Sequence, residues 1–332
     1  TYCFTSKPGF SKVGSYTGAR PNDVLVQTGF QPAFVMIKAS NATDDWFIVD
    51  DKREGTSAPT KSLLANSLAI ESSFTGVEFL TNGFRLVGSA NSGGTNNSGT
   101  TFIYLAIAAD GSTATPSLAN SFATEIYSGN NSSQSVTTGF KPDFSWLKSR
   151  TGSLDHNLID SVRGNYFLNT NRTSVQEAGY NGVVFNNNGF TVAAVGGTTS
   201  GEINVSGQNY VAWNWKAGGT PSINTDGTIT SVVSANQAAG FSIVSYTGSG
   251  GVATIGHGLN QVPEMIIVKS TTVAQNWAVY NKDVGNQYWL QLNSYSSKIT
   301  EAIWNNTTPT SSVFSLNGNG VINVNNSTNI AY

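Results

Sequence analysis

The two histidines are the side chains whose ordinary pKa lies nearest neutrality, so they are the first candidates for acid–base chemistry. His156 stands where two corresponding segments of the chain carry Trp46 and Trp277, and His257 lies between two glycines. A catalytic site needs groups that can meet, and these histidines lie in different segments. The sequence therefore favours a structural role for each of them.

The carboxylates Asp50, Asp51 and Glu54 could form the acid pair of a glycosidase. Such a pair must face across a cleft at about 5–10 Å. The corresponding segments carry Asp160 and the mixed stretch 281–283, so the charge is not kept from one segment to the next. We therefore predict no catalytic residue, and the chain is not expected to be an enzyme.

Metal and cofactor chemistry has little support in the sequence. Cys3 is the only cysteine, which excludes an internal disulfide framework and a cysteine-based metal site. The dense carboxylates are Asp44-Asp45 and Asp50-Asp51, and no Asp-x-Asp-x-Asp-Gly calcium loop occurs. A solvated loop is favoured over calcium, and we expect no metal and no cofactor.

Glycan binding would use an exposed aromatic ring flanked by amide side chains, because sugar faces stack on rings and hydroxyl groups need planar polar partners. Trp46 and Trp277 recur at corresponding positions on alternating strands, which is typical of a core. Trp304, followed by Asn305 and Asn306, lies in a polar stretch that only one segment has. These three residues are the candidate glycan site.

Composition restricts the partners. The chain of 332 residues has 17 basic and 19 acidic residues, a net charge of −2, and no basic cluster. A nucleic-acid-binding surface would need a basic patch, which this composition does not indicate. No apolar run approaches the ~18 residues of a membrane span. Charged residues make up only 11%, with Gly, Ser, Thr and Asn between short apolar runs, which is typical of a turn-rich β protein.

The elements that would position these side chains recur in three copies of about 100 residues. Each copy begins with a strand that ends in Tyr-x-Gly, followed by an apolar strand that starts after a proline and ends in lysine. A strand with a Trp or His side chain, an Asn-Gly pair typical of a hairpin turn and an aromatic-rich closing strand follow in that order. Many short strands with such turns predict an all-β fold with one β-sandwich per copy. The predicted units are residues 9–110, 121–219 and 240–332, with a linker or small hairpin at 220–239 and a leading strand at 1–8.

The third copy lacks part of its closing strand. It stops at Ile330-Ala331-Tyr332, and Tyr2-Cys3-Phe4 continues the same pattern, with Tyr2 matching Tyr332. We therefore predict that Tyr2, Cys3, Phe4, Ile330 and Tyr332 meet at a closing strand. The leading strand would come either from the same chain, closing a ring, or from a neighbouring chain.

The chain resembles a tandem-repeat domain of tail fibres and other virion appendage proteins of marine and environmental bacteriophages. The resemblance rests on GFSKVGSYTG (9–18), KPDFSWLK (141–148), His156 to Gly164, YVAWNWKAGG (210–219) and GFSIVSYTG (240–248). It implies a concanavalin- or laminin-G-like (jelly-roll) sandwich and a virion structural setting outside the cell.

Two functions follow as hypotheses. The first is a non-enzymatic structural part of a phage tail fibre or other appendage, an oligomer whose partners are copies of itself or other virion proteins. The second is host attachment, with a lectin-like module that reads bacterial surface polysaccharide. Neither hypothesis involves nucleic acid or insertion into a membrane.

Overall fold

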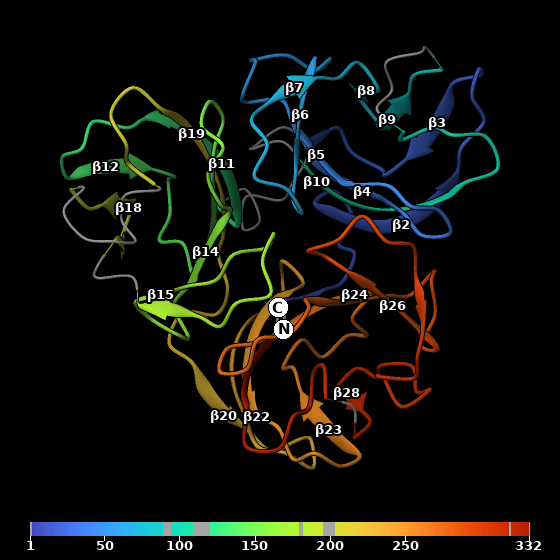
Figure 1. Cartoon of the computed structure of the whole chain (residues 1–332), viewed down its shortest axis with the longest axis vertical. Helices are drawn as coiled ribbons and strands as arrows, with labels where there is room; N and C mark the ends of the chain where they lie inside the picture. The colour runs from blue at the N-terminus through green and yellow to red at the C-terminus, as the bar shows by residue number, and fades with distance from the viewer. Residues whose placement is uncertain are drawn as a thin grey trace.

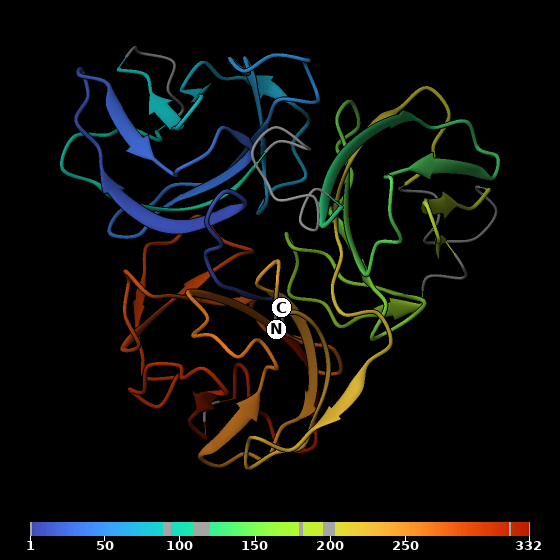
Figure 2. The ribbon, with the colours of Figure 1, turned by 180° about the vertical axis from the view of Figure 1, so that it is seen from behind.

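The computed structural model describes residues 2–88, 94–108, 120–178, 182–194, 203–318 and 320–331. All regular elements in these ranges are β-strands, and every pairing between the strands is antiparallel. The prediction of an all-β fold is confirmed. Figure 1 shows the strands gathered in three lobes around a common centre, and Figure 2 shows the same arrangement from behind.

Lobe 1, built from β2 to β10, has a large sheet in the order β2-β10-β4-β5-β6-β7 and a small sheet in the order β3-β9-β8. Its strands are β2 (Ser11–Thr17), β3 (Val24–Gln27), β4 (Pro32–Ala39), β5 (Trp46–Asp50), β6 (Lys61–Leu64), β7 (Ser72–Ser73), β8 (Val77–Leu80), β9 (Gly83–Leu86) and β10 (Thr101–Ala108).

Lobe 2, built from β11 to β19, repeats this plan with a large sheet β11-β19-β13-β14, a small sheet β12-β18-β17 and the pair β15-β16. Its strands are β11 (Phe122–Ser128), β12 (Gln134–Thr137), β13 (Phe144–Ser149), β14 (Asn157–Asp160), β15 (Tyr166–Phe167), β16 (Glu177–Ala178), β17 (Val183–Asn186), β18 (Gly189–Val192) and β19 (Asn209–Trp215).

Lobe 3 consists of β20 to β29 together with β1 from the start of the chain. Its large sheet runs β20-β21-β22-β1-β24-β25-β26-β27, with β29 also paired to β22 and β24, and β23-β28 form a small sheet. Its strands are β1 (Tyr2–Phe4), β20 (Ser222–Asn224), β21 (Ser231–Asn236), β22 (Phe241–Thr247), β23 (Ala253–Gly256), β24 (Met265–Ser270), β25 (Ala278–Asn281), β26 (Tyr288–Gln291), β27 (Ile299–Thr300), β28 (Val313–Leu316) and β29 (Thr328–Ala331). The segment 220–239, for which the sequence left a linker or a small hairpin open, contains the hairpin β20–β21, and this hairpin belongs to the third sheet.

Each large sheet is buried on both faces. In β10, Phe102 and Tyr104 face the small sheet of their own lobe, whereas Ile103, Leu105 and Ile107 face the centre of the molecule. The centre-facing side chains of all three lobes form one cluster, which we call the central core. It includes Phe34, Trp46, Trp146, Trp213, Trp215, Phe241, Ile267 and Trp277. Strands covered on both sides need apolar residues at consecutive positions, which accounts for the unbroken apolar run of β10.

Trp46 and Trp277 lie in the central core at 1% and 0% exposure, so their prediction as core residues is confirmed.

The Asn-Gly signals mark two hairpins, but their turns differ from the prediction. Leu80 pairs with Gly83, so the turn residues are Thr81 and Asn82 rather than Asn82 and Gly83. The glycine is needed for a different reason: a Cβ on Gly83 would lie 2.0 Å from the carbonyl oxygen of Val26 on the neighbouring strand. Gly189 is placed in the same way in lobe 2. In lobe 3 the signal fails, because β28, which precedes Asn317-Gly318, pairs within the described residues only with β23.

Candidate functional site

Strands β1 and β29 together fill one position in the third sheet. Ala331 is paired with Val244 and Val268, and Tyr2 is paired with Ile243 and Ile267, the next residues along the same two neighbours. The two ends of the chain therefore form a composite strand between β22 and β24. In the other lobes the equivalent position is filled by a single strand, β10 between β2 and β4, and β19 between β11 and β13.

The composite strand is firmly packed. Cys3 and Ile330 are fully buried and Phe4 nearly so, with the Phe4 ring 5.2 Å from that of Phe241 and 6.5 Å from that of Trp215 in lobe 2. Burial raises the pKa of the Cys3 thiol to about 12, which makes it an inert packing group. Tyr332, the fifth residue predicted for this strand, lies outside the described residues, as does Thr1.

The segment after β1 is also tied to lobe 3. The Ser6 backbone N–H donates to Glu264 Oε2 at 3.0 Å, and the Glu264 N–H donates to the Phe4 carbonyl at 2.7 Å. In lobe 2 the equivalent carboxylate, Asp143, receives the Ala217 N–H at 2.9 Å. In lobes 2 and 3, an acidic residue directly after the proline thus binds the chain as it leaves the closing strand, whereas lobe 1 has Ala33 at this position. The corresponding exit from lobe 1 falls in 109–119, at the boundary between the predicted units 9–110 and 121–219. These residues lie outside the described ranges.

Three lysines at equivalent positions link each lobe to the next. Each is buried, and each ammonium group donates to a backbone carbonyl on the neighbouring lobe. These bonds run from Lys38 to Tyr295 at 3.0 Å, from Lys148 to Leu68 at 3.0 Å and from Lys269 to Thr173 at 3.1 Å. The direction is cyclic: lobe 1 reaches lobe 3, lobe 2 reaches lobe 1, and lobe 3 reaches lobe 2.

A ring N–H makes a second bond at each of these interfaces. Here Trp46, His156 and Trp277 are equivalent, and each ring N–H donates to a backbone carbonyl of the neighbouring lobe. The acceptors Gln291 and Leu64 are the strand partners of Ala278 and Phe47, the residues that follow Trp277 and Trp46. The distances are 2.8 Å from Trp46 Nε1 to Gln291, 3.0 Å from His156 Nε2 to Leu64 and 2.9 Å from Trp277 Nε1 to Asn169. Backbone N–H groups donate across the same three interfaces in the opposite direction, from Lys298 to Ser40, from Glu71 to Arg150 and from Gln176 to Thr271.

His156 fits this structural role. Its Nδ1 accepts the Trp146 Nε1–H at 2.8 Å, so its proton must sit on Nε2, which donates to Leu64. Burial, with the nearby Lys148 charge, lowers its pKa well below 6.5. His257, buried and bonded to the Thr310 carbonyl, has its pKa lowered to about 4. Both histidines are therefore neutral packing groups near pH 7.

The buried lysines give the protein a stability that should rise with pH. Burial lowers the pKa of Lys38 and of Lys269 from 10.5 to about 8. Between these values the unfolded chain binds more protons than the folded chain, so the free energy of unfolding increases with pH. We expect the increase between pH 8 and pH 9, by up to about 1.4 kcal/mol per lysine. Above pH 9 the buried Cys3 thiol acts in the opposite sense.

Urea unfolding at the two pH values measures this slope. Lys38→Met should reduce it, whereas Lys61→Met, at an exposed lysine of β6, should leave it unchanged. A flat or falling profile in the parent protein would contradict the assignment.

The predicted glycan residues are not arranged as expected. Trp304 is 1% exposed, with its ring edge-on to Tyr280 at 5.7 Å in the core of lobe 3, so it offers no face to a sugar. Asn305 and Asn306 form a tight left-handed turn with φ of 54° and 50°, and Asn306 is exposed. The ring packs in the apolar core of lobe 3, although polar residues follow it in the sequence, which is why its sequence context was misleading.

A buried ion cluster lies between lobes 1 and 2. Asp50 pairs with Arg53 at 2.7 Å and also accepts the Trp213 Nε1–H from lobe 2 at 3.0 Å. Glu71 joins Arg53 at 3.0 Å to Arg150 of lobe 2 at 2.7 Å. The candidate acid Asp50 is therefore committed to the interface. This cluster was not predicted, although its signal is visible in the sequence as Asp-x-x-Arg at 50–53 and again at 160–163, where Arg163 pairs with Asp160.

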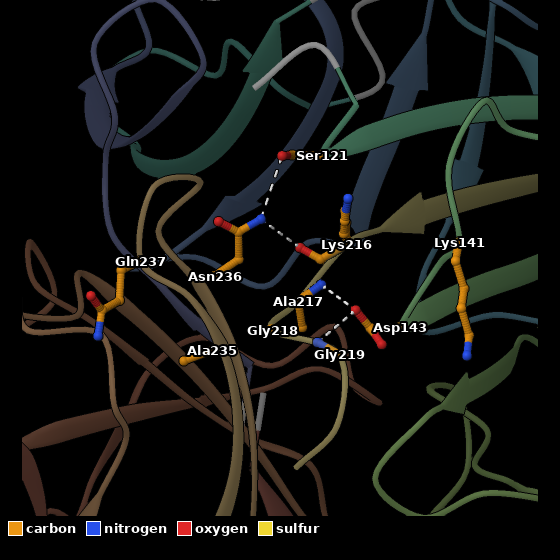
Figure 3. Close-up of a pocket in the computed structure, with 10 residues that line it drawn as sticks. All are labelled: Ser121, Lys141, Asp143, Lys216, Ala217, Gly218, Gly219, Ala235, Asn236 and Gln237. Carbon is orange, nitrogen blue, oxygen red and sulfur yellow. Dashed lines mark hydrogen bonds between the residues drawn. The ribbon is translucent and has the colours of Figure 1, made fainter. Parts of the chain in front are cut away.

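An open pocket of about 510 Å³ lies between lobes 2 and 3 (Figure 3). Lys141 and Asp143 stand on the lobe 2 side and Asn236 and Gln237 on the lobe 3 side, with the segment 216–219 between them. Part of this lining lies in the segments 141–148 and 210–219, but nothing in their sequence indicates that they meet Ser121 and residues 235–237 at one pocket, because the four segments are far apart in the chain.

The described residues contain no group of three His, Cys, Asp or Glu side chains that could hold a metal ion. They also contain no helix long and apolar enough to cross a membrane.

Comparison with known proteins gives one result that bears on identity. A family model described as "Domain of unknown function (DUF7483)" matches residues 1–110 and 117–332, which is nearly the whole chain. The search of curated proteins found no match to this chain. The chain therefore belongs to the DUF7483 family.

Proposed function

We propose that this chain is a non-enzymatic structural protein of a virion appendage, such as a phage tail fibre, with three tandem β-sandwich repeats of the jelly-roll or concanavalin kind. The observation that carries the proposal is the cyclic set of contacts between lobes. A lysine, a ring N–H and a backbone N–H recur at all three interfaces, and the contact between lobes 3 and 1 has the same form as the others. Contacts of this kind suit a structural building block, because each lobe is bonded to both of its neighbours.

The groups that could do chemistry support a structural role, because the described contacts use them for packing. His156 and Asp50 hold lobe interfaces together, and Cys3 is buried in the composite strand. The pKa shifts of Cys3 and of the histidines arise mainly from burial and favour the uncharged form. A protein of this kind would act through its surface, with copies of itself or other virion proteins as partners.

The phage setting and the location outside the cell rest on the sequence resemblance. They can be tested by immunogold electron microscopy of particles purified from the producing bacterial culture, with an antibody raised against this chain. We expect label on an appendage of the particle. Label found only in the soluble fraction, with none on intact particles, would overturn the proposal.

A further inference from the structure

The hairpin β20–β21 distinguishes lobe 3 from the other two. It adds two strands beyond β22, the equivalent of the edge strands β2 and β11. The pocket between lobes 2 and 3 lies where this hairpin meets lobe 2 (Figure 3). An adjoining pocket of about 310 Å³ shares Gly218, Ala235 and Gln237 with it and continues along the hairpin. We call the two together the hairpin groove.

The hairpin groove presents several groups that both donate and accept hydrogen bonds, together with the carboxylate of Asp226 in the second pocket, which accepts from Asn224 Nδ2 at 2.8 Å. Asn236 and Gln237 supply amides to the first pocket, and Ser222, Asn224 and Asn260 line the second. No aromatic side chain lines either pocket. Amides and hydroxyls suit a ligand rich in hydroxyl groups, because each hydroxyl also donates and accepts.

Charge adds a second requirement. Lys141 and Lys216 are exposed at the first pocket, and neither forms an ion pair with any residue in the described ranges. The carboxylate in that pocket, Asp143, is already occupied: it accepts the N–H groups of Ala217 and Gly219 and the Ser161 hydroxyl. The first pocket therefore carries excess positive charge in a protein whose net charge is −2.

The two lysines extend in different directions in Figure 3, Lys216 toward Ser121 and Lys141 away from it. Their charges are thus spread over the pocket rather than focused on one point. A compact ion would reach one of them, whereas an extended ligand with repeated negative groups could use both.

We propose that the hairpin groove binds an acidic oligosaccharide, with carboxylates of its sugar units on Lys141 and Lys216 and its hydroxyl groups along β20–β21. This inference goes beyond the structural role proposed above and does not depend on it, so its failure would leave that role intact.

The test is calorimetric titration of the full chain with a short oligogalacturonate, and with a maltooligosaccharide of the same length as the neutral counterpart. We expect saturable binding of the acidic sugar only. Lys141→Gln with Lys216→Gln should weaken it at least about tenfold, the effect of losing roughly 1.4 kcal/mol. Asn236→Ala should weaken it with both lysines in place.

Lys61→Gln and Lys12→Gln together provide the matched control, because they remove two charges from lobe 1, away from the groove. They should leave the affinity unchanged. Equal binding of both sugars, no binding of the acidic sugar, or the same loss in the control and in the groove variant would each overturn the proposal. Stronger binding of an acidic peptide than of the sugar would also overturn it.

Discussion

Removing residues 1–6 should destabilise the protein more than any single surface change. The truncation deletes β1, so β22 and β24 lose their shared partner over Phe241–Ile243 and Met265–Ile267. It also removes Phe4 from the central core, a loss worth about 3–5 kcal/mol by itself. We expect a much lower urea midpoint, and association of the truncated chains through the exposed strands, measured by urea unfolding and by light scattering.

Single substitutions give the matched control. Phe4→Ala should cost about 3–5 kcal/mol, whereas Leu25→Ala, at a leucine that is 68% exposed, should cost almost nothing. A peptide of residues 1–8 added to the truncated chain should restore part of its stability. A truncated chain that unfolds at the parent's midpoint and stays monomeric would show that β1 is dispensable.

The second large effect is expected at the interface between lobes 3 and 2. Trp277 is fully buried in the central core, and its Nε1–H donates to the Asn169 carbonyl of lobe 2. Trp277→Ala should therefore lower the free energy of unfolding by about 3–5 kcal/mol. Chemical unfolding followed by far-UV circular dichroism measures this loss.

Two conservative substitutions separate the hydrogen bond from the loss of volume. Trp277→Phe leaves the Asn169 carbonyl without its donor, whereas Trp304→Phe removes an Nε1–H that has no partner within the described residues. We expect Trp277→Phe to cost about 1–3 kcal/mol more than Trp304→Phe. Equal costs would mean that the bond between the lobes adds no stability.

Local pattern in the sequence predicts strands and core positions well. The tryptophans at 46 and 277 recur at corresponding positions of two copies, and both lie in the core. The stretch Thr-Asp-Gly-Thr at 225–228 is typical of a turn and indicates a hairpin within 220–239. Strands β20 and β21 pair on either side of it. Each of these features depends on residues close together in the chain.

Contacts between lobes could not be read in the same way. The unbroken apolar run of β10 indicates burial on both faces, but it does not say what covers the second face. The lysines that end the Pro-led strands recur in the sequence, but nothing in the sequence indicates that they donate to carbonyls of another lobe. Lys38, for example, donates to the Tyr295 carbonyl. Trp304 was expected to be exposed because its neighbours in the sequence are polar. These residues are not the neighbours of its ring in space, and the ring is buried.

The central claim is that one chain closes its own ring, with β1 completing the third sheet. Cys3 lies directly opposite Ser242 on the antiparallel neighbour β22, and both are buried. Residues opposite each other on antiparallel strands have Cα atoms about 4.5–5.5 Å apart, which suits a disulfide. Since Cys3 is the only native cysteine, Ser242→Cys creates a single possible pair within the chain.

The decisive measurement is a non-reducing gel with thiol titration of Ser242→Cys refolded under oxidising conditions. The account predicts a monomer with no free thiol, and the parent chain as a monomer with one. Disulfide-linked dimers, or two thiols that stay free in the folded variant, would contradict closure within the chain.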